Sequence, residues 1–481
     1  MSKRIKYLFT TTNGLVLMAM AIAGIVTAIW GTLSAPMIAW GVKDITVNIL
    51  GMELVEVQRE GRIIMLYHSI ALAVMAILVY FITAVVRMDK QLALMARNLA
   101  TAGYLVALIS GLIFAYFGYN WTFHGLFLLG QASSFIAGVI LAVALWPWNK
   151  KYYLGPGTQY AHLKSGLDLE RLAFWTMTMA TIGSAMLGAW AGAYFGNGFE
   201  AFLGEDIIRY VDKNYWQKAI IGHLHIMLAL IGIAITLVTG RWLDFKGFWH
   251  KIAMPAMIIG ILWLTGGSWS VVVTEQAHTF IYIGAVFSMS GGLFLVIYGL
   301  PKIMKERLQE QGLLGKASFG QKAKALLHNP LKFGFMWQMI FMNFTVSGVG
   351  IFMAVKLTDI IRVWPHREER TELVGHWHIL ATIIATIILF YFADRVGLKG
   401  KSRQWFGWSI ILGSNLAFAS MTIFGLKRLA VTEYMQQPVI NITWLLADIG
   451  LGLVLIAFAA FMVWRLVDLI NPNGSWRAEI D

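Results

Sequence analysis

Long apolar runs recur along the whole chain and constrain its fold more than any other feature. An apolar run of about 20 residues crosses the hydrocarbon core of a bilayer as a helix. Of the 481 residues, 58% are hydrophobic and 13% are charged. Charged residues make up about 25% of an ordinary soluble protein. The sequence therefore predicts an all-α polytopic membrane protein with no room for a sizeable soluble domain.

Twelve transmembrane helices are expected in a single membrane domain, residues 1–481. The predicted spans are 10–32, 62–87, 96–118, 121–147, 168–195, 216–240, 249–272, 277–301, 331–356, 371–394, 402–425 and 439–466. Cytoplasmic loops carry an excess of lysine and arginine, and an orientation with both termini in the cytoplasm places 26 of the 38 basic residues there. This orientation accounts for most of the net charge of +13, so no nucleic-acid partner is expected. The basic segment 302–332 is expected to be a loop on the inner headgroups.

Three segments resemble one another around His68, His223 and His376: MLYHSIALAVMAILVYFI, IIGHLHIMLALIGIAITLV and LVGHWHILATIIATIILFY. The first two histidines are 155 residues apart and the last two are 153 apart. Repeats of this length predict three pseudo-symmetric four-helix units around a pseudo-threefold axis, not a solenoid. The predicted repeats cover residues 1–150, 151–305 and 330–481.

Cysteine is absent, which excludes disulfides, Cys-ligated iron–sulfur clusters, zinc–thiolate sites and covalent c-type haem. Histidine, in contrast, recurs near the outer ends of the predicted helices. Five histidines share one depth there: His68, His223, His225, His376 and His378. An imidazole in hydrocarbon is costly unless it is hydrogen-bonded or ligated. Hydrogen bonding between helices could explain one such residue, but five in one layer favour a shared role as ligands.

Two of the segments carry an H-x-H pair, His223/His225 and His376/His378. Residues i and i+2 of a helix lie about 200° apart, so the two rings point to opposite sides. They cannot share one metal, but they can serve two sites that flank the helix. Haem iron in a helix bundle takes histidines from facing helices. The pattern predicts two b-type haems side by side, with the helix 371–394 between them.

At this point the chain resembles the catalytic subunit of the haem-copper oxidase and nitric oxide reductase superfamily. That family has twelve helices in three groups of four, and a low-spin haem bound by histidines of its second and tenth helices. His68 in YHSIALAVMAIL matches the first of these positions, and His378 in GHWHILATI matches the second. His376 matches the ligand of the neighbouring haem. Lys427 and Arg428 fall where basic residues of the loop between the last two helices pair with haem propionates.

The chain also departs from this family. The span 249–272 lacks the histidine pair that helps bind the second metal, and no copper is expected. In place of that metal site, the i, i+2 geometry turns one histidine of the pair His223/His225 toward the second haem, opposite His376. The preferred ligand pairs of two six-coordinate b-type haems are then His68–His378 and His225–His376. A haem with two histidine ligands has no open position for O2 or NO and only passes electrons. His223 either forms a hydrogen bond or faces a third pocket, where His124 could join it to hold a third haem.

A further cluster is predicted at the outer membrane surface. His124 and His278 open the spans 121–147 and 277–301 on that side, and Glu275 precedes His278. A histidine beside a carboxylate suits coupled release of protons and electrons from a quinol. Helix capping is the alternative explanation for these residues.

The preferred hypothesis is a multi-pass electron-transfer subunit of a prokaryotic cytoplasmic membrane. It would exchange electrons between the quinone pool and a cytochrome c-type partner on the outer side, within a respiratory quinol:cytochrome c oxidoreductase that includes other membrane subunits. It is not expected to reduce O2 by itself. One alternative is an active terminal oxidase or nitric oxide reductase with a high-spin haem and an unusual second metal. A transporter that uses the histidines as proton relays is another.

Overall fold

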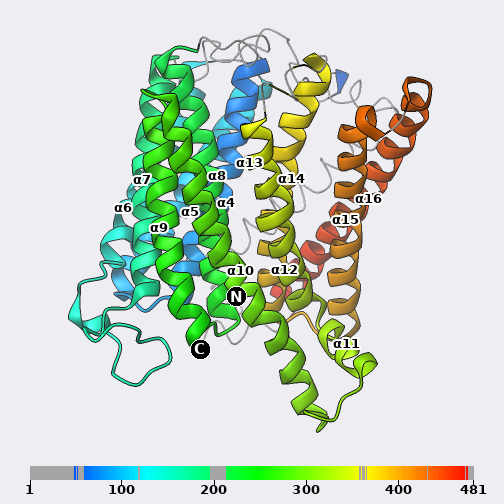
Figure 1. Ribbon diagram of the computed structural model, residues 1–481. Coiled ribbons are helices and arrows are strands. Elements are labelled where there is room, and N and C mark those ends of the chain that lie inside the picture. The colour runs from blue at the N-terminus through cyan, green and yellow to red at the C-terminus, as the bar shows by residue number, and fades with distance from the viewer. Residues whose placement is uncertain are drawn as a thin grey trace. The chain divides into compact units, whose positions relative to one another are not determined.

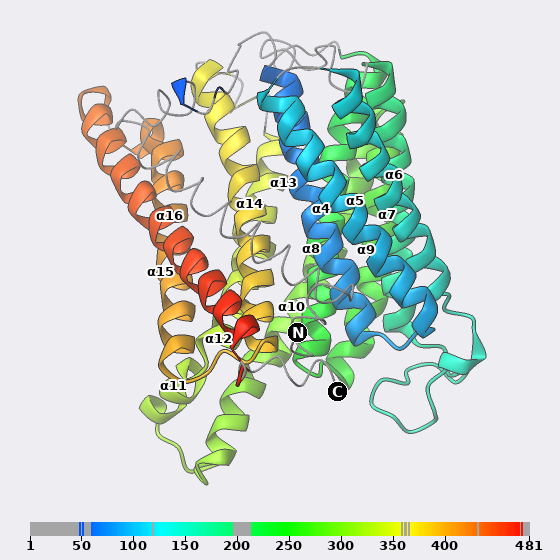
Figure 2. The same ribbon diagram turned by 180° about the vertical axis from the view of Figure 1, so that it is seen from behind.

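The computed structural model describes residues 48–49, 51, 59–117, 120–195, 213–356, 359, 363, 366–430, 432–471 and 473–474. Within these residues all regular secondary structure is helical (Figures 1 and 2). Ten of the described helices are long and apolar enough to cross a membrane. The prediction of a helical, multi-pass membrane protein is confirmed at this level. The predicted span 10–32 lies outside the described residues.

The chain divides into two compact units. Unit A is Gly51–Gly299, and unit B combines Met1–Leu50 with Leu300–Asp481. The long helices that begin in unit A are α4 (Arg59–Val85), α5 (Lys90–Tyr116), α6 (Trp121–Ala144), α7 (Leu169–Tyr194), α8 (Tyr215–Trp242), α9 (Phe248–Ser270) and α10 (His278–Glu310). The helices of unit B are α11 (Phe319–Leu327), α12 (Pro330–Ile340), the π-helical segment η6 (Phe341–Val346), α13 (Ser347–Val355), α14 (His366–Arg395), α15 (Gly400–Ala430) and α16 (Glu433–Ile470).

Side-chain caps begin several of these helices where the sequence supplies a short polar residue. The Asp89 carboxylate accepts hydrogen bonds from the backbone of Gln91 and Leu92 at the start of α5. Asn214 forms a capping box with Gln217 at the start of α8. Each cap satisfies backbone N–H groups that the first helical turn leaves without partners. The polar residues between the apolar runs therefore determine where the helices begin.

Two predicted loops are largely helical. Segment 302–332 contains the last turns of α10, all of α11 and the start of α12. The loop expected before the last span is short, because α15 continues to Ala430 and α16 begins at Glu433. Hydropathy identifies only the part of a helix that lies in hydrocarbon. Hydropathy therefore does not predict the polar last turns of α10 and α15.

Glycines allow the helix backbones of α5 and α6 to touch. A Cβ atom added to Gly103 would lie 2.6 Å from the Gly130 carbonyl oxygen, and one added to Gly130 would lie 2.6 Å from the Ala107 nitrogen. Small residues that permit such close approach are typical of helix contacts within membranes. The atoms in contact are backbone atoms, so no side-chain rotation could make room for a larger residue.

The same contact recurs in two later hairpins. In α9 and α10, a Cβ atom on Gly260 would lie 3.0 Å from the Gly284 carbonyl oxygen. In α15 and α16, a Cβ atom on Gly413 would lie 2.7 Å from the Gly450 carbonyl oxygen. Gly260 follows Gly103 by 157 residues, and Gly413 follows Gly260 by 153. These intervals agree with the repeat period predicted from the histidines.

A buried guanidinium joins three helices at one end of unit A. Arg171, in the first turn of α7, is 2% exposed. Its side chain donates to the backbone carbonyls of Arg87 beyond the end of α4, Ala144 at the end of α6 and Trp146 just after α6, at 2.6, 2.5 and 3.3 Å. The last carbonyls of a helix have no partner within it, so Arg171 satisfies groups that would otherwise be buried unpaired.

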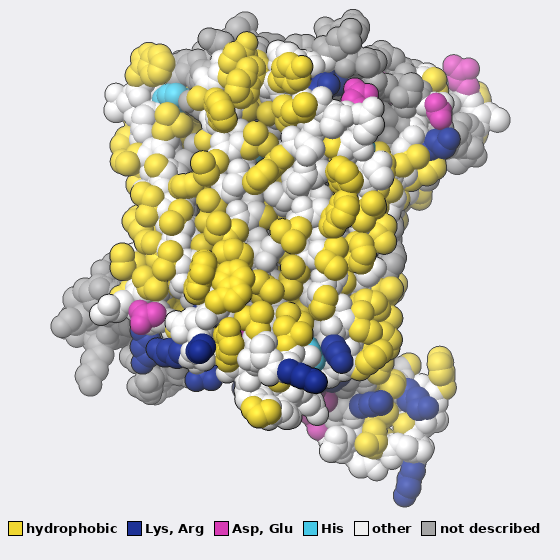
Figure 3. Space-filling model, turned by 60° about the vertical axis from the view of Figure 1, so that its left-hand side comes forward, with side chains coloured by type: hydrophobic (Ala, Val, Ile, Leu, Met, Phe, Trp, Pro, Cys, Tyr) yellow, Lys and Arg dark blue, Asp and Glu magenta, His cyan; other side chains and the backbone are white. Residues whose placement is uncertain are grey.

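The surface matches a protein that crosses a bilayer. On the face drawn in Figure 3, hydrophobic side chains cover the middle of the helices, and most visible Lys and Arg side chains lie toward one end. Lysine and arginine gather on the cytoplasmic side of membrane proteins. We therefore call this end, which contains Arg171, the predicted inner end.

The glycine contact predicts a sharp difference between two substitutions in α6. Gly130→Ala should lower the free energy of unfolding by about 2 kcal/mol, because the new methyl group overpacks a backbone contact. Gly125→Ala is the matched control in the same helix, since a Cβ atom there would meet nothing within 4 Å. Denaturation midpoints of the two purified variants measure the difference. Equal midpoints would contradict the close contact of α5 and α6.

Candidate histidine layer

The predicted ligand histidines fall into both units. His68 lies in α4, and His223 and His225 lie in α8, so these three belong to unit A. His376 and His378 lie in α14 of unit B. The pairs His68–His378 and His225–His376 each join the two units, and the side chain of His378 lies outside the described residues. Both pairs therefore stay predictions.

His223 occupies a niche in the surface of α7. A Cβ atom added to Gly188 would lie within 2.6 Å of three atoms of the His223 ring, so the imidazole fills the space that this glycine leaves. Nδ1 of His223 lies 2.8 Å from the Ser184 carbonyl oxygen, to which it can donate a hydrogen bond. Metal-binding histidines usually donate their second ring nitrogen to such an acceptor. This bond leaves Nε2 as the nitrogen available to a ligand.

His68 lies beside His223. Their ring centres are 6.3 Å apart and their planes are inclined by only 16°. Phe127 of α6 contacts His68 edge-on, with ring centres 6.3 Å apart. Of the two alternatives that the sequence left for His223, the structure shows the hydrogen bond, to Ser184, and the third pocket with His124 stays a prediction. Two near-parallel imidazoles from different helices thus share one part of the histidine layer.

His225 faces the other side of α8. Its ring is exposed in unit A, and its Nδ1 lies 2.8 Å from the Ile221 carbonyl oxygen one turn earlier. His223, by contrast, is packed against α7. The two rings of this H-x-H pair therefore have different surroundings, as the helix geometry predicts, whereas their service to two metal sites stays a prediction.

His376 in unit B repeats the niche of His223. A Cβ atom on Gly350 of α13 would lie 2.8 Å from Nε2 of His376. The π-helical segment η6 precedes this glycine by one turn, and such segments are frequent at functional sites. Equivalent histidines of two sequence repeats therefore pack on a glycine of the preceding helix.

Lys427 is placed differently from the prediction. It lies in the last turn of α15, not in a loop, and it is 4% exposed. Its ammonium group lies 4.3 Å from the centre of the Phe424 ring. No carboxylate of the described residues forms an ion pair with it. The side chain of Arg428 is outside the described residues.

The predicted quinol cluster is partly assembled. His278 begins α10, and its Nδ1 lies 2.7 Å from the Glu275 carbonyl oxygen. The Glu275 carboxylate is solvent-exposed and lies 3.9 Å from the Lys218 ammonium group. His124, which is 4% exposed, lies instead between the rings of Phe114 and Trp121, each centred 5.6 Å away.

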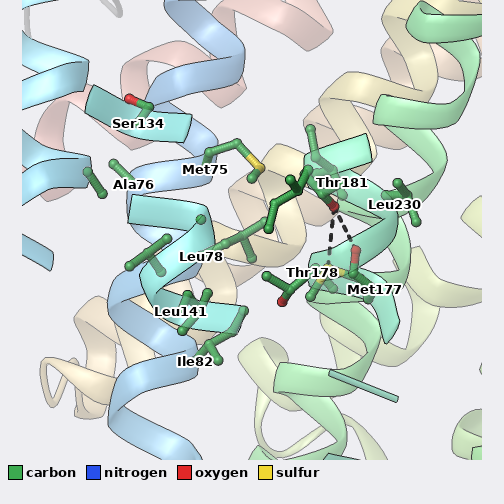
Figure 4. A pocket seen from close by; sticks show the side chains of 16 residues that line it. Met75, Ala76, Leu78, Ile82, Ser134, Leu141, Met177, Thr178, Thr181 and Leu230 are labelled. Atoms are coloured by element: carbon green, nitrogen blue, oxygen red, sulfur yellow. Dashed lines mark hydrogen bonds between the residues drawn. The ribbon is translucent and has the colours of Figure 1, made fainter. Parts of the chain in front are cut away.

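A small cavity lies farther along the helices that carry His68 and His223. It holds about 50 Å³ and is lined by α4, α5, α6, α7 and α8 (Figure 4). Met75 and Leu230 line it two turns beyond those histidines, and the hydroxyl groups of Ser134, Thr178 and Thr181 are its few polar groups. A space of this size admits one or two water molecules. It is too small for a substrate or a cofactor.

A buried ionic network at the predicted inner end was missed by the sequence analysis. His250 is 0% exposed and Glu170 is 3% exposed. Nε2 of His162 lies 2.7 Å from Nδ1 of His250. The Glu170 carboxylate lies 3.5 Å from Nε2 of His250 and 2.8 Å from Nε of Arg241. The sequence gives no sign of this contact, because His162 and His250 are 88 residues apart and belong to no motif.

The segment before α7 is held against the turn after α8 by this network. Tyr160 donates a short hydrogen bond to the Asp244 carboxylate, and Tyr298 donates to the Asp244 carbonyl oxygen at 2.7 Å. Asp244 has a positive φ of 49°, a conformation that Asp tolerates in turns. Burial and the bond to Asp244 raise the pKa of Tyr160 well above its usual value. These contacts, between His162 and His250 and between Tyr160 and Asp244, stabilise the fold, and we call them the clasp.

Comparisons with known proteins add no relative to this description. The chain matches no family model, no curated protein and no solved structure. Among the described residues, no group of three or more His, Cys, Asp or Glu side chains could hold a metal ion.

The clasp predicts that the protein loses stability in mild acid. Burial, His250 and Lys251 hold the pKa of His162 below its ordinary value of 6.5. The unfolded chain then binds more protons than the folded one between 6.5 and that lower pKa, so stability falls as pH falls through this window. Burial and Glu170 raise the pKa of Asp168 from 3.8, which acts in the opposite direction, with stability lost as pH rises.

Replacing one histidine separates the two effects. His162→Gln should flatten the loss of stability between pH 7.5 and pH 5.5, because it removes one titrating group and leaves Asp168 in place. Thermal midpoints of the wild type and the variant at the two pH values measure this change. An equal pH slope in both proteins would show that His162 keeps its ordinary pKa.

Proposed function

We propose that this chain is a haem-bearing electron-transfer subunit of a membrane oxidoreductase. It would exchange electrons between the quinone pool and a cytochrome c-type partner on the outer side of the membrane. The observation that carries the proposal is the pair His68 and His223, two near-parallel imidazoles from different helices with ring centres 6.3 Å apart. Apolar surroundings make such a pair costly unless it is bonded or ligated.

The spacing of the pair suits one metal ion between the rings. Metal–imidazole bonds of about 2 Å on each side would place the ring centres roughly 6 Å apart. The hydrogen bond from Nδ1 of His223 to Ser184 holds one ring in a fixed orientation. A b-type haem bound here would supply an iron that takes up and releases one electron. The residues present fit this group, because both imidazoles can serve as neutral ligands.

This geometry favours a different partner for His68 from the one that the resemblance implied. His68 and His223 would hold one iron, and His225, on the opposite side of α8, remains for a second iron with His376. Lys427, buried without a described acidic partner, would bind a haem propionate. The pair His68–His378 is the competing assignment.

Quinol oxidation would take place near the start of α10. Because Nδ1 of His278 is engaged by the Glu275 carbonyl, its Nε2 is the nitrogen that would accept a quinol proton. The Glu275 carboxylate is exposed and would pass this proton to water.

The resemblance to the haem-copper oxidase superfamily supports the remaining parts of the proposal. The chain would have twelve spans in three pseudo-symmetric units, with both termini in the cytoplasm. It would lie in the cytoplasmic membrane of a prokaryote, with other membrane subunits as partners.

The spectrum of the purified protein tests this function. The dithionite-reduced protein should show low-spin b-type haem bands that carbon monoxide does not change, because both axial positions of each iron are taken by histidine. A CO-sensitive high-spin haem would instead support an active oxidase or nitric oxide reductase. A protein without haem would overturn the proposal and leave a transporter as the candidate.

Single variants then identify the ligands of each haem. His68→Ala and His223→Ala should remove the same low-spin haem, and His225→Ala should remove the other. Haem content by pyridine haemochrome and the low-spin electron paramagnetic resonance signals follow each loss. If His378→Ala removes the haem of His68 while His223→Ala retains it, the assignment from the resemblance is correct and the one from unit A is wrong.

A further inference from the structure

A basic cavity lies at the predicted inner ends of α4 and α5, which run side by side in both ribbon views (Figures 1 and 2). It holds about 470 Å³ and opens to the surface. Its lining combines cationic and apolar side chains with no acidic one: Thr83, Ala84, Val85, Val86, Arg87, Met88, Lys90, Ala93, Leu94 and Arg97. The proposed electron-transfer function makes no use of it.

Three cations converge on this cavity from α5 and the turn before it: Arg87 lies in the turn, and Lys90 and Arg97 lie in α5. Arg97 is held in place, because its Nε donates to the Thr83 hydroxyl at 2.6 Å and its guanidinium lies 5.1 Å from the centre of the Tyr80 ring. Arg87 and Lys90 are exposed at the rim. The nearby Asp89 carboxylate, which accepts hydrogen bonds from the backbone of α5, offsets only one of these three positive charges.

Hydrogen bonds from buried groups hold the backbone and the Thr83 side chain at the base of the cavity. The carbonyl of Arg87 accepts a hydrogen bond from Arg171, which is 2% exposed. Thr83 is 9% exposed and donates to the carbonyls of Val79 and Tyr80 at 2.7 and 2.9 Å. The end of α4 and the turn that carries Arg87 are therefore held by hydrogen bonds to buried groups.

An apolar surface leads away from the cavity along α5. Leu94, which lines the cavity, is 51% exposed. Ile109 and Leu112 are 58% and 37% exposed farther along the same helix. A ligand that fills the basic cavity could therefore lay a hydrocarbon chain against this helix.

We propose that this cavity binds the phosphate group of an anionic phospholipid from the predicted inner leaflet. Arg and Lys side chains bind phosphate oxygens through charge-assisted hydrogen bonds, and basic pockets at the cytoplasmic side of membrane proteins bind lipid headgroups. Free phosphate shares this chemistry, but it would leave the apolar rim and the exposed face of α5 uncovered. The cavity and the helix surface together select a ligand with both parts.

Native mass spectrometry of the full-length, delipidated protein tests the proposal. Phosphatidylglycerol should bind the wild type more tightly than phosphatidylcholine, whose choline cation opposes the three basic side chains. Arg87→Gln/Lys90→Gln should weaken phosphatidylglycerol binding at least about tenfold, since each cation near the surface contributes about fivefold. This double variant leaves the anchored Arg97 unchanged, and unaltered circular dichroism verifies its fold.

The matched control removes the same charge from the same end of the molecule. Lys164→Gln/Lys251→Gln replaces two exposed cations that do not line the cavity, and it should bind phosphatidylglycerol like the wild type. Equal weakening in both double variants would overturn the proposal in favour of a general effect of charge. Displacement of the lipid by an equimolar amount of inorganic phosphate would overturn the assignment to a lipid, as would equal affinity for phosphatidylcholine.

Discussion

The close approach of helix backbones at glycine is the contact on which both units depend. Lipid tails are as apolar as leucine, so burial of apolar surface does not drive helices together within a bilayer. Packing between backbones takes its place at Gly103 and Gly130, where an added Cβ atom would meet a carbonyl oxygen or an amide nitrogen. Because backbone atoms cannot rotate aside, each crossing point fixes the register of two helices. Side chains on those helices are then held at definite depths.

Glycine also seats the imidazoles. His223 and His376 each occupy the space that a side chain at Gly188 or Gly350 would need. The ring of His223 therefore packs against α7, and its Nδ1 lies within hydrogen-bond distance of the Ser184 carbonyl oxygen. The glycine-lined niche thus fixes the position of a ring that is costly to bury.

Apolar runs predicted the positions of eleven described helices, because hydrocarbon thickness sets their minimum length. The same reasoning failed where helices leave the bilayer, as in α10 beyond Pro301, since a polar helical turn outside hydrocarbon has no hydropathy signal. The H-x-H spacing predicted the opposite orientations of His223 and His225, because a helix has a fixed rotation per residue. No local rule could pair His162 with His250, whose contact depends on how α7, α8 and α9 pack. Lys427 was predicted to lie in the loop before the last span. It is instead buried in the last turn of α15, because this helix extends beyond its apolar run.

Charged residues and a histidine contact lie at different positions along α7 of unit A. Glu170 and Arg171 lie in the first turn, where a carboxylate meets Arg241 and a guanidinium meets backbone carbonyls. Ser184 lies about 21 Å farther along the helix, beside the ring of His223. A neutral imidazole can be buried without a countercharge if its nitrogens are satisfied, and the neutral form is also the one that binds metals. The charged residues thus stabilise the end of the helix, and the histidine lies away from them.

Lys427, a buried cation of unit B, forms no ion pair with a carboxylate among the described residues. Under the proposed function, the propionate of a bound haem would supply a negative charge that the described residues do not place there.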